Sequence, residues 1–421
     1  MLLYSSVVNI LNGLIKTVGA SVPEGHPRKF MRFLRGQKDI IRHVRDTYRK
    51  DPARPTIWIH AASFGEYSVA RPLITEFKRR GMQIVVTFFS PSGYEALEKY
   101  HPEVDYLYYL PFDTVGNARS FLDTVRPDKA VFIVSEYWFN YLQLLRLRGI
   151  DTYLVSAKIT DKSIFFRWYG KLYRRCLPTY THMFVIDGDS KENLQRLGCG
   201  RVSVSGNPLF DNAIEKAAQP WSDAKIEAFC DGQDVFIAGS VHDENDMKLV
   251  TEIANRHPDT KFIIVPHEIT PSAVQSLEAM LRGRTAVYSR VTSADNIGEA
   301  QVLIVDIMGS LAYIYRYARW AYVGGGFTRY LHSLIEATVY GLPVAFGPEI
   351  HRKITPEEIS RRGVGQIVST ADELDAWFSS LKDNPARMAE ISGKARAYVA
   401  ENAGATDEIV DKILSSLSAN S

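Results

Sequence analysis

Thr56–Ile74, with the sequence TIWIHAASFGEYSVARPLI, is the stretch from which the fold can be inferred. It opens with the β-prone apolar run Thr56–Ile59 and passes through a short loop into Ser63–Glu66 (SFGE). From Val69 onward the apolar residues recur at helical spacing. The stretch therefore predicts a strand, a tight loop and a helix whose first turn contains Glu66.

The carboxylate of Glu66 has two interpretations. In open α/β sheets the loops that follow strands form the ligand crevice, where a carboxylate can act as a general base. Alternatively, Glu66 complements the partial positive charge at the start of its helix. The helix dipole also predicts a lowered pKa for this carboxyl, so useful basicity would require removal of water by a bound substrate.

Size and composition indicate a globular chain with more than one domain. At 421 residues the chain exceeds the size of one hydrophobic core, and 46% hydrophobic with 23% charged residues are ordinary proportions. Cys176, Cys199 and Cys230 form no pairing motif and fit a reducing compartment. Neither CxxC nor HExxH occurs, which argues against a structural zinc site.

The first 50 residues differ from the rest in charge and pattern. Apolar residues of Met1–Ala20 follow one helical face, and the segment is too short and too polar to span a bilayer. Residues 1–50 also carry ten Lys or Arg against only three acids. An amphipathic helix on an anionic membrane surface fits this pattern, and a helix packed on its own domain is the alternative. Nucleic acid is not expected as a partner, because no binding motif accompanies the basic run.

Strand-like runs alternate with helical segments twice along the chain. In residues 51–212 the further runs are Gln83–Phe89, Tyr106–Leu110, Lys129–Val134, Asp151–Ser156, His182–Ile186 and Arg201–Val204. Ser205–Asp211 (SGNPLFD) is a turn cluster that marks a boundary. In residues 213–421 the strand-like runs are Asp234–Ala238, Lys261–Val265, Thr285–Tyr288, Val302–Val305, Ala321–Val323, Leu342–Phe346 and Gly365–Val368. This second domain is predicted to end in helices. Two α/β domains with mainly parallel sheets are therefore predicted.

One aromatic and basic segment interrupts the first domain. Phe165–Arg175 (FFRWYGKLYRR) could form a surface for anionic lipid or sugar, or could pack its aromatic rings inward.

The second domain has features of nucleotide binding. Gly324, Gly325 and Gly326 follow a strand, where their backbone N–H groups could approach an anion closely. His332 and Glu336 are predicted on one face of the next helix. Glu336 could accept ribose hydroxyls, or could simply bond to His332. Further backbone donors for a phosphate are expected at two other strand ends, in Gly239-Ser240 and Met308-Gly309.

Together these motifs resemble the bacterial 3-deoxy-D-manno-octulosonic acid (Kdo) transferases of lipopolysaccharide synthesis. The resemblance covers nearly the whole chain. It is carried, in order, by His60–Glu66, Ser135–Asn140, Ser156–Lys158, Gly239–His242, Pro266-His267, Asp306–Gly309, Gly324–Gly326 and His332–Ala337. It implies a GT-B glycosyltransferase, in which two Rossmann-like domains face each other across a cleft.

The resemblance also implies substrates and residue roles. The donor would be CMP-Kdo and the acceptor a lipid A precursor, at the cytoplasmic face of the bacterial inner membrane, with peripheral or monotopic attachment. Glu66 matches the general base of the family and Glu136 a glutamate that stabilises the transition state. The family's CMP-binding segments match Pro266-His267, Met308-Gly309-Ser310 and Ser333–Glu336. No cofactor and no metal are expected, since no DxD-like acidic cluster is positioned for an ion.

Four positions depart from the family pattern. His267 stands where many members have Arg, Ser333 where they have Asn, and Ser310 where they have Glu. Leu209 occupies a position that is often basic, and Lys158 or Arg329 could replace that cation. Ser63 is a further candidate on the acceptor side. The alternatives are a related GT-B enzyme with another sugar nucleotide, and a non-catalytic, membrane-attached protein that binds a sugar nucleotide.

Overall fold

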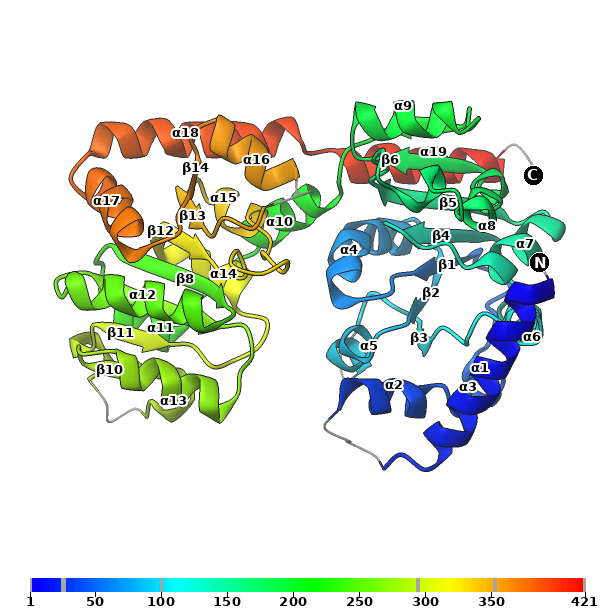
Figure 1. Cartoon of the computed structure of the whole chain (residues 1–421), viewed down its shortest axis with the longest axis horizontal. Coiled ribbons are helices and arrows are strands. Elements are labelled where there is room, and N and C mark those ends of the chain that lie inside the picture. Colours follow the sequence, from blue (N-terminus) through cyan, green and yellow to red (C-terminus); the bar gives the residue numbers. More distant parts are fainter. Residues whose placement is uncertain (1, 24–27, 99–100, 293–295, 351–353, 419–421) are drawn as a thin grey trace. The chain divides into compact units, whose positions relative to one another are not determined.

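The chain divides into two compact units. The computed structural model describes residues 2–23, 28–98, 101–292, 296–350 and 354–418. Unit 1 comprises Met1–Asn212 together with Ala403–Ser421, and unit 2 comprises Ala213–Asn402. Each unit contains one seven-stranded sheet with helices packed around it (Figure 1). All the strand pairings in both sheets are parallel. This confirms the predicted α/β class with two Rossmann-like sheets.

The sheet of unit 1 has the order β3-β2-β1-β4-β5-β6-β7. Its strands are β1 (Thr56–His60), β2 (Gln83–Phe88), β3 (Tyr106–Tyr109), β4 (Lys129–Ile133), β5 (Asp151–Ala157), β6 (His182–Val185) and β7 (Val202–Val204). Every residue of β1, β2 and β4 is buried. Strands covered on both faces are mostly apolar on both faces, and the buried polar residues of these runs, such as Gln83 and Lys129, lie mainly at strand ends.

Helices cover this sheet and extend to both ends of the chain. They are α1 (Leu2–Ala20), α2 (Lys29–Gly36), α3 (Ile40–Thr47), α4 (Phe64–Arg79), α5 (Pro91–Glu98), α6 (Val115–Val125), α7 (Phe139–Leu147), α8 (Lys171–Arg174), α9 (Gly188–Arg196) and α19 (Ala405–Ser418), with 3-10 turns at Ile164–Phe166 and Leu177–Thr179. The first three helices are part of unit 1. Gln37, between α2 and α3, is buried, and its side chain bonds to the backbone of Leu110 and Phe112 at 3.0 Å each.

The sheet of unit 2 has the order β10-β11-β9-β8-β12-β13-β14. Its strands are β8 (Val235–Val241), β9 (Lys261–Pro266), β10 (Thr285–Val287), β11 (Val302–Ile304), β12 (Ala318–Val323), β13 (Val344–Phe346) and β14 (Gly365–Ile367). The helices of this part are α10 (Leu209–Ala218), which begins in unit 1, α11 (Ala224–Cys230), α12 (Glu244–Arg256), α13 (Pro271–Met280), α14 (Leu311–Ile314), α15 (Ile335–Thr338), α16 (Ile354–Arg361), α17 (Ala371–Lys382) and α18 (Pro385–Glu401). Short 3-10 turns occupy Tyr288–Arg290, Ile297–Glu299 and Tyr315–Tyr317.

The last helix, α19, belongs to unit 1, whereas the sequence pattern assigns residues 213–421 to one domain. Ile409 and Ile413 are fully buried in the same apolar cluster as Leu73 and Phe77 of α4. The Asp211 carboxylate accepts hydrogen bonds from the first turn of α19, including the Thr406 N–H at 2.8 Å. Burial of an apolar face against α4 and capping by Asp211 therefore draw the C-terminus back to the first sheet, which no local pattern reveals.

We expect Ile409→Ala to lower the free energy of unfolding by about 2–4 kcal/mol, because it leaves a cavity beneath α19. Denaturant unfolding measures the loss of unfolding free energy, and hydrogen exchange shows which part of the protein is destabilised. Exchange should accelerate in α4 and α19 and stay unchanged in β8 and β12. The control is Glu408→Ala, at an exposed position of the same helix, which should change stability little. Acceleration confined to unit 2 would contradict the assignment of α19.

Candidate functional site

Each of the two sheets has one point at which the direction of strand addition reverses, and predicted site residues lie at the carboxyl ends of the strands there. In unit 1 the reversal falls between β1 and β4, and in unit 2 between β8 and β12. Ligands of open α/β sheets bind outside the carboxyl ends of strands at such points. Ser63 and Glu66 follow β1, Glu136 follows β4, and Lys158 follows β5 directly. Unit 1 thus brings its four predicted residues to one edge of its sheet.

Glu66 lies in the first turn of α4 and takes part in a capping box. The Glu66 carboxylate accepts a hydrogen bond from the Ser63 N–H at 3.1 Å, and the Ser63 hydroxyl accepts one from the Glu66 N–H at 3.4 Å. Burial and then the negative charge of Glu136 raise the Glu66 pKa to about 7, against the lowering effect of the Ala62 and Ser63 N–H groups. The lowered pKa expected from the helix dipole is therefore wrong, because burial outweighs it.

Glu136 is held by two donors in a buried network. Its carboxylate accepts hydrogen bonds from the indole N–H of Trp138 and from Nε2 of His60, the latter at 3.1 Å. On the other side of the ring, Nδ1 of His60 lies 2.9 Å from Oγ1 of Thr87, which accepts the indole N–H of Trp58. Nδ1 of His60 also lies 3.0 Å from the Thr87 carbonyl oxygen, so both ring nitrogens have hydrogen-bond partners.

Three residues in strained backbone conformations lie at these strand ends. Val134, two residues before Glu136, has φ of 68°, which is rare for a β-branched side chain. Ser156 in β5 has φ of 58° and Ser240 in β8 has φ of 54°. Such strain costs free energy and persists where the surrounding structure fixes a functional geometry. All three immediately precede or belong to predicted site segments.

Because the native pKa of Glu66 lies above its unfolded value, its ionisation opposes folding. The neutral form contributes full stability below the unfolded pKa, near 4.5, and this contribution is lost as the pH rises toward 7. We therefore expect Glu66→Gln to raise the free energy of unfolding by about 1–2 kcal/mol at pH 8 and to change it little at pH 4. Glutamine also keeps the capping box.

Two further variants make this test specific. Glu136→Gln removes the charge that raises the Glu66 pKa, so it should lower that pKa in a carbon-13 NMR titration. Glu76→Gln on the same helix should destabilise the protein at pH 8, because Arg79 and Arg80 lower the pKa of Glu76 to about 2. A Glu66 pKa near 4 in the intact protein would contradict the proposed environment.

In unit 2 the predicted residues follow four strands. Gly239 and Ser240 lie in β8, Pro266 ends β9 with His267 next, and Met308-Gly309-Ser310 follow β11. The loop after β12 contains Gly325, Gly326, His332 and Ser333, and Glu336 lies in α15. These strands are neighbours in the sheet, so the structure gathers these residues at one sheet edge as well.

The glycines after β12 do not present all their N–H groups to a ligand, in contrast to the prediction. The Gly324 N–H donates to the Gly239 carbonyl at 2.9 Å, and the Gly325 N–H donates to the Asp246 carboxylate at 2.7 Å. A Cβ at Gly324 would lie 2.2 Å from the Ser240 carbonyl oxygen, and one at Gly326 would lie 2.4 Å from the Gly347 nitrogen. These glycines are therefore required for close packing of loops.

His332 is not on the helix of Glu336, which corrects the second expectation. The helix α15 begins at Ile335, and the His332 N–H is instead bonded to the Gly324 carbonyl at 3.2 Å. This bond holds His332 in the loop. Burial raises the pKa of Glu336, and Lys216 opposes the shift. Leu209 packs against the apolar core of unit 1, which accounts for an uncharged side chain there.

Several polar atoms at this edge of unit 2 have no hydrogen-bond partner among the described residues. They are the hydroxyls of Ser310 and Ser333 and the Nδ1 atom of His242, all buried. Buried polar groups are normally paired, so these three atoms are exceptions within unit 2. Sequence reasoning assigned no role to His242 or to Asp246, because a residue's contacts with distant loops leave no local signal.

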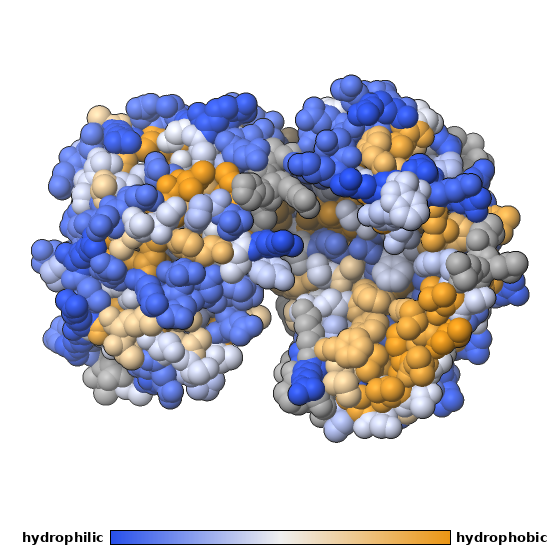
Figure 2. Space-filling view, viewed as in Figure 1, coloured by the Kyte–Doolittle hydropathy of each residue, from blue (hydrophilic) through white to orange (hydrophobic). Residues whose placement is uncertain are grey.

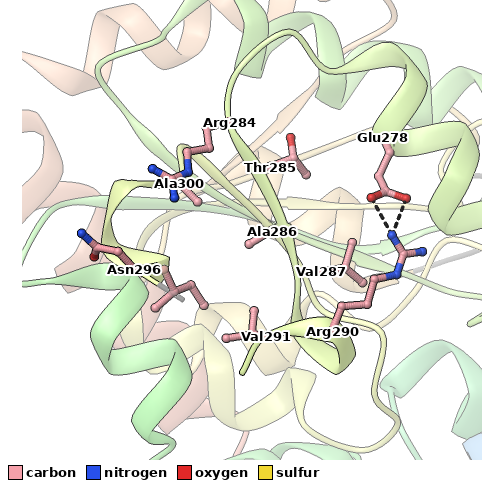
Figure 3. A pocket seen from close by; sticks show the side chains of 10 residues that line it. Glu278, Arg284, Thr285, Ala286, Val287, Arg290, Val291, Asn296 and Ala300 are labelled. Atoms are coloured by element: carbon pink, nitrogen blue, oxygen red, sulfur yellow. Dashed lines mark hydrogen bonds and ion pairs between the residues drawn. The ribbon is translucent and has the colours of Figure 1, made fainter. Parts of the chain in front are cut away.

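Two pockets among the described residues are lined by side chains other than the predicted ones. One of about 250 Å³ in unit 2 lies at β10, where the Glu278 carboxylate and Arg290 pair at 2.8 Å (Figure 3). None of the predicted donor-binding residues lines it. In unit 1, a pocket of about 570 Å³ is lined by the cationic side chains of Arg32, Arg35 and Lys38, with Tyr94 and Tyr109.

Solved structures share this fold. A UDP-GlcNAc 2-epimerase from Neisseria meningitidis bound to UDP-GlcNAc is 17% identical with a TM-score of 0.62, over 86% of this chain and 100% of that one. The glycotransferase of kitacinnamycin is 14% identical with a TM-score of 0.52, over 86% and 99%. The chain therefore has the predicted GT-B-like fold.

Sequence comparisons find one kind of transferase among the relatives. Residues 36–212 match the family model of 3-deoxy-D-manno-octulosonic-acid transferase (kdotransferase). The 3-deoxy-D-manno-octulosonic acid transferase of Bordetella pertussis is 27% identical over 382 residues, which are 86% of this chain and 87% of the relative. The chain is thus similar to Kdo transferases over most of its length.

Proposed function

We propose that this chain is an inverting glycosyltransferase that transfers Kdo from CMP-Kdo to a lipid A precursor. The observation that carries the proposal is the pair of carboxylates at the reversal point of unit 1. Glu66, with a pKa near 7, is suited to act as a general base at neutral pH, and Glu136 is fixed by two N–H donors. The names of the family and of the relatives supply the substrate class.

The chemical step follows from these two residues. Glu66 accepts the proton of the acceptor's primary hydroxyl, whose oxygen attacks the anomeric carbon of Kdo as the bond to the CMP phosphate breaks. The charge of Glu136 stabilises the positive charge that develops on the sugar. The charge of Glu136 also raises the pKa of Glu66. In this proposal Glu136 therefore both strengthens the base and stabilises the transition state.

The donor nucleotide binds at the carboxyl edge of unit 2 in this proposal. In this proposal the hydroxyls of Ser310 and Ser333, which have no partner among the described residues, bond to oxygen atoms of the nucleotide. Glu336 accepts the ribose hydroxyls, as acidic residues do in Rossmann domains. The serines at these two positions provide neutral hydrogen bonds where other members of the family have different side chains.

The experiment combines purified protein, CMP-Kdo and a lipid A precursor, and identifies the product by mass. We expect Kdo transfer, and a fall of about 10²–10⁴-fold in turnover for Glu66→Gln with CMP affinity unchanged. Glu76→Gln on the same helix is the matched control. Transfer from another CMP- or UDP-sugar alone would favour the related enzyme, and CMP binding without any transfer would favour the non-catalytic alternative.

The surface of α1 supports attachment to the membrane that contains the acceptor, at the cytoplasmic face of the bacterial inner membrane. One side of α1 packs on unit 1: Val8 is buried, and the Tyr4 hydroxyl donates to the Asp113 carboxylate at 2.7 Å. Other apolar side chains of α1 face outward, including Ile10 (65% exposed) and Leu14 (59% exposed). Figure 2 shows hydrophobic residues gathered in the region of α1.

Charge and length make this a peripheral attachment in the proposal. Among the described residues, no helix combines the length and apolarity needed to cross a membrane. Exposed cationic side chains between α2 and α3 and within α3 include Lys38, Arg42 and Arg45. Arg42 lies 3.6 Å from the Asp39 carboxylate, and Arg32 pairs with Glu95 at 2.8 Å. An apolar face and a basic surface together give firmer binding to anionic lipid than either alone.

We expect Leu14→Asp to release the protein from anionic vesicles in a co-sedimentation assay, because it places a charge in the exposed apolar face. Asn9→Asp adds the same charge at another exposed position and should have a much smaller effect. Activity on detergent-dispersed acceptor should persist in both variants. Equal sedimentation of Leu14→Asp and the intact protein would place the attachment elsewhere, with Trp168 (90% exposed) the next candidate.

A further inference from the structure

We propose that His242, His267 and His332 of unit 2 form a binding site for a divalent transition metal ion of the zinc class. The three residues come from three adjacent strands. His242 directly follows β8, His267 directly follows β9, and His332 lies in the loop after β12. The site does not rest on the proposed transferase activity, because it is defined by these side chains alone.

The geometry of the three rings is close to that of a metal site. One ligand nitrogen from each histidine lies within 4.8 Å of those of the other two. The ring centroids of His267 and His332 are 4.4 Å apart, and those of His242 and His267 are 4.9 Å apart. Zinc binds imidazole nitrogen at about 2.0–2.1 Å, which places ligand nitrogens about 3.4 Å apart. Small side-chain rotations therefore suffice to close the cluster around an ion.

The backbone on each side of the cluster is fixed by hydrogen bonds. The Asp246 carboxylate accepts hydrogen bonds from the backbone N–H groups of His242, at 2.9 Å, and Gly325, at 2.7 Å. It also accepts one from the Tyr322 hydroxyl at 2.5 Å. The backbone N–H of His267 donates to the Val241 carbonyl at 2.8 Å. Asp246 thus ties the β8 and β12 loops together, which prepares the ligand positions before an ion binds.

Gly325 makes room for the third ligand. It has φ of 85°, and a Cβ at this position would lie 2.3 Å from the Tyr330 carbonyl oxygen and 3.2 Å from Cδ2 of His332. The loop after β12 can therefore bring His332 close to the other two rings only with glycine here.

The chemistry of the ligands selects the ion. Three imidazoles suit zinc, nickel and copper, whereas calcium and magnesium require oxygen ligands. Nδ1 of His242 is buried and has no hydrogen-bond partner among the described residues, so a bound ion could satisfy it or fix its ring. Three protein ligands leave a fourth coordination position, which water or an oxyanion can occupy. His267 is exposed, which gives the ion a path of entry.

Untagged full-length protein, freed of metal by chelation, is titrated with Zn²⁺ by calorimetry and with Co²⁺ by absorption spectroscopy. We expect about one equivalent of each to bind, with the visible absorption of tetrahedral cobalt. His267→Ala should weaken binding by at least about 100-fold, as should His242→Ala. Because His267 is exposed, its substitution should leave the circular dichroism spectrum and the melting temperature of the metal-free protein unchanged.

The control is His43→Ala, an exposed histidine of unit 1, which should bind zinc as the intact protein does. Zinc should also raise the melting temperature of the intact protein and not that of His267→Ala. The proposal is overturned if the intact protein binds neither ion at 100-fold molar excess. It is equally overturned if His267→Ala binds zinc as tightly as the intact protein, or if magnesium competes with zinc at equal concentration.

Discussion

Parallel pairing forces the carboxyl ends of all seven strands in each unit to one edge of the sheet, and the functional geometry depends on this constraint. The chain then reverses its direction of strand addition, between β1 and β4 in unit 1 and between β8 and β12 in unit 2. At each reversal the two following loops diverge, and the space between them is available to a ligand. Glu66 and Glu136 follow the two strands of the first reversal. The same rule places His242 and the glycine loop at the second reversal. Both candidate sites thus follow from sheet topology rather than from helix position.

Competition between burial and backbone polarity decides the character of Glu66. A helix start and two N–H groups favour the charged carboxylate, and a fully exposed residue in this position would be a weak base. Burial acts in the opposite direction, and the nearby charge of Glu136 adds to it, so that the pKa reaches about 7. The network of His60 and Trp138 holds Glu136 in the position from which it exerts this influence. The base strength is therefore a property of the folded unit and not of the motif.

Local pattern sufficed for the class of fold, because buried parallel strands are continuously apolar and each is followed by a helix. The strands predicted from Gln83–Phe89 and Lys261–Val265, for example, agree with β2 and β9 within a residue at either end. Pattern failed where long-range contacts decide. The position of α19 depends on a core formed by α4, and the loop conformation of His332 depends on a bond to Gly324. The three histidines are far apart in the sequence, so no spaced metal motif marks them. Asp246, which organises two loops, likewise has no signature other than its contacts.

The edge of unit 2 where we propose that the donor binds carries a cost that a ligand can offset. Each buried polar atom without a partner destabilises a fold by about 1–3 kcal/mol, and Ser310 and Ser333 each contribute such a hydroxyl. The strained backbone of Ser240 adds to this cost. These hydroxyls already lost their water when the chain folded, so a ligand that bonds to them does not have to displace water from them. Part of the ligand's affinity therefore comes from giving partners to these unsatisfied groups. Small neutral hydroxyls at Ser310 and Ser333 are therefore compatible with a tight site, since donors that are held in place and already desolvated lose little on binding.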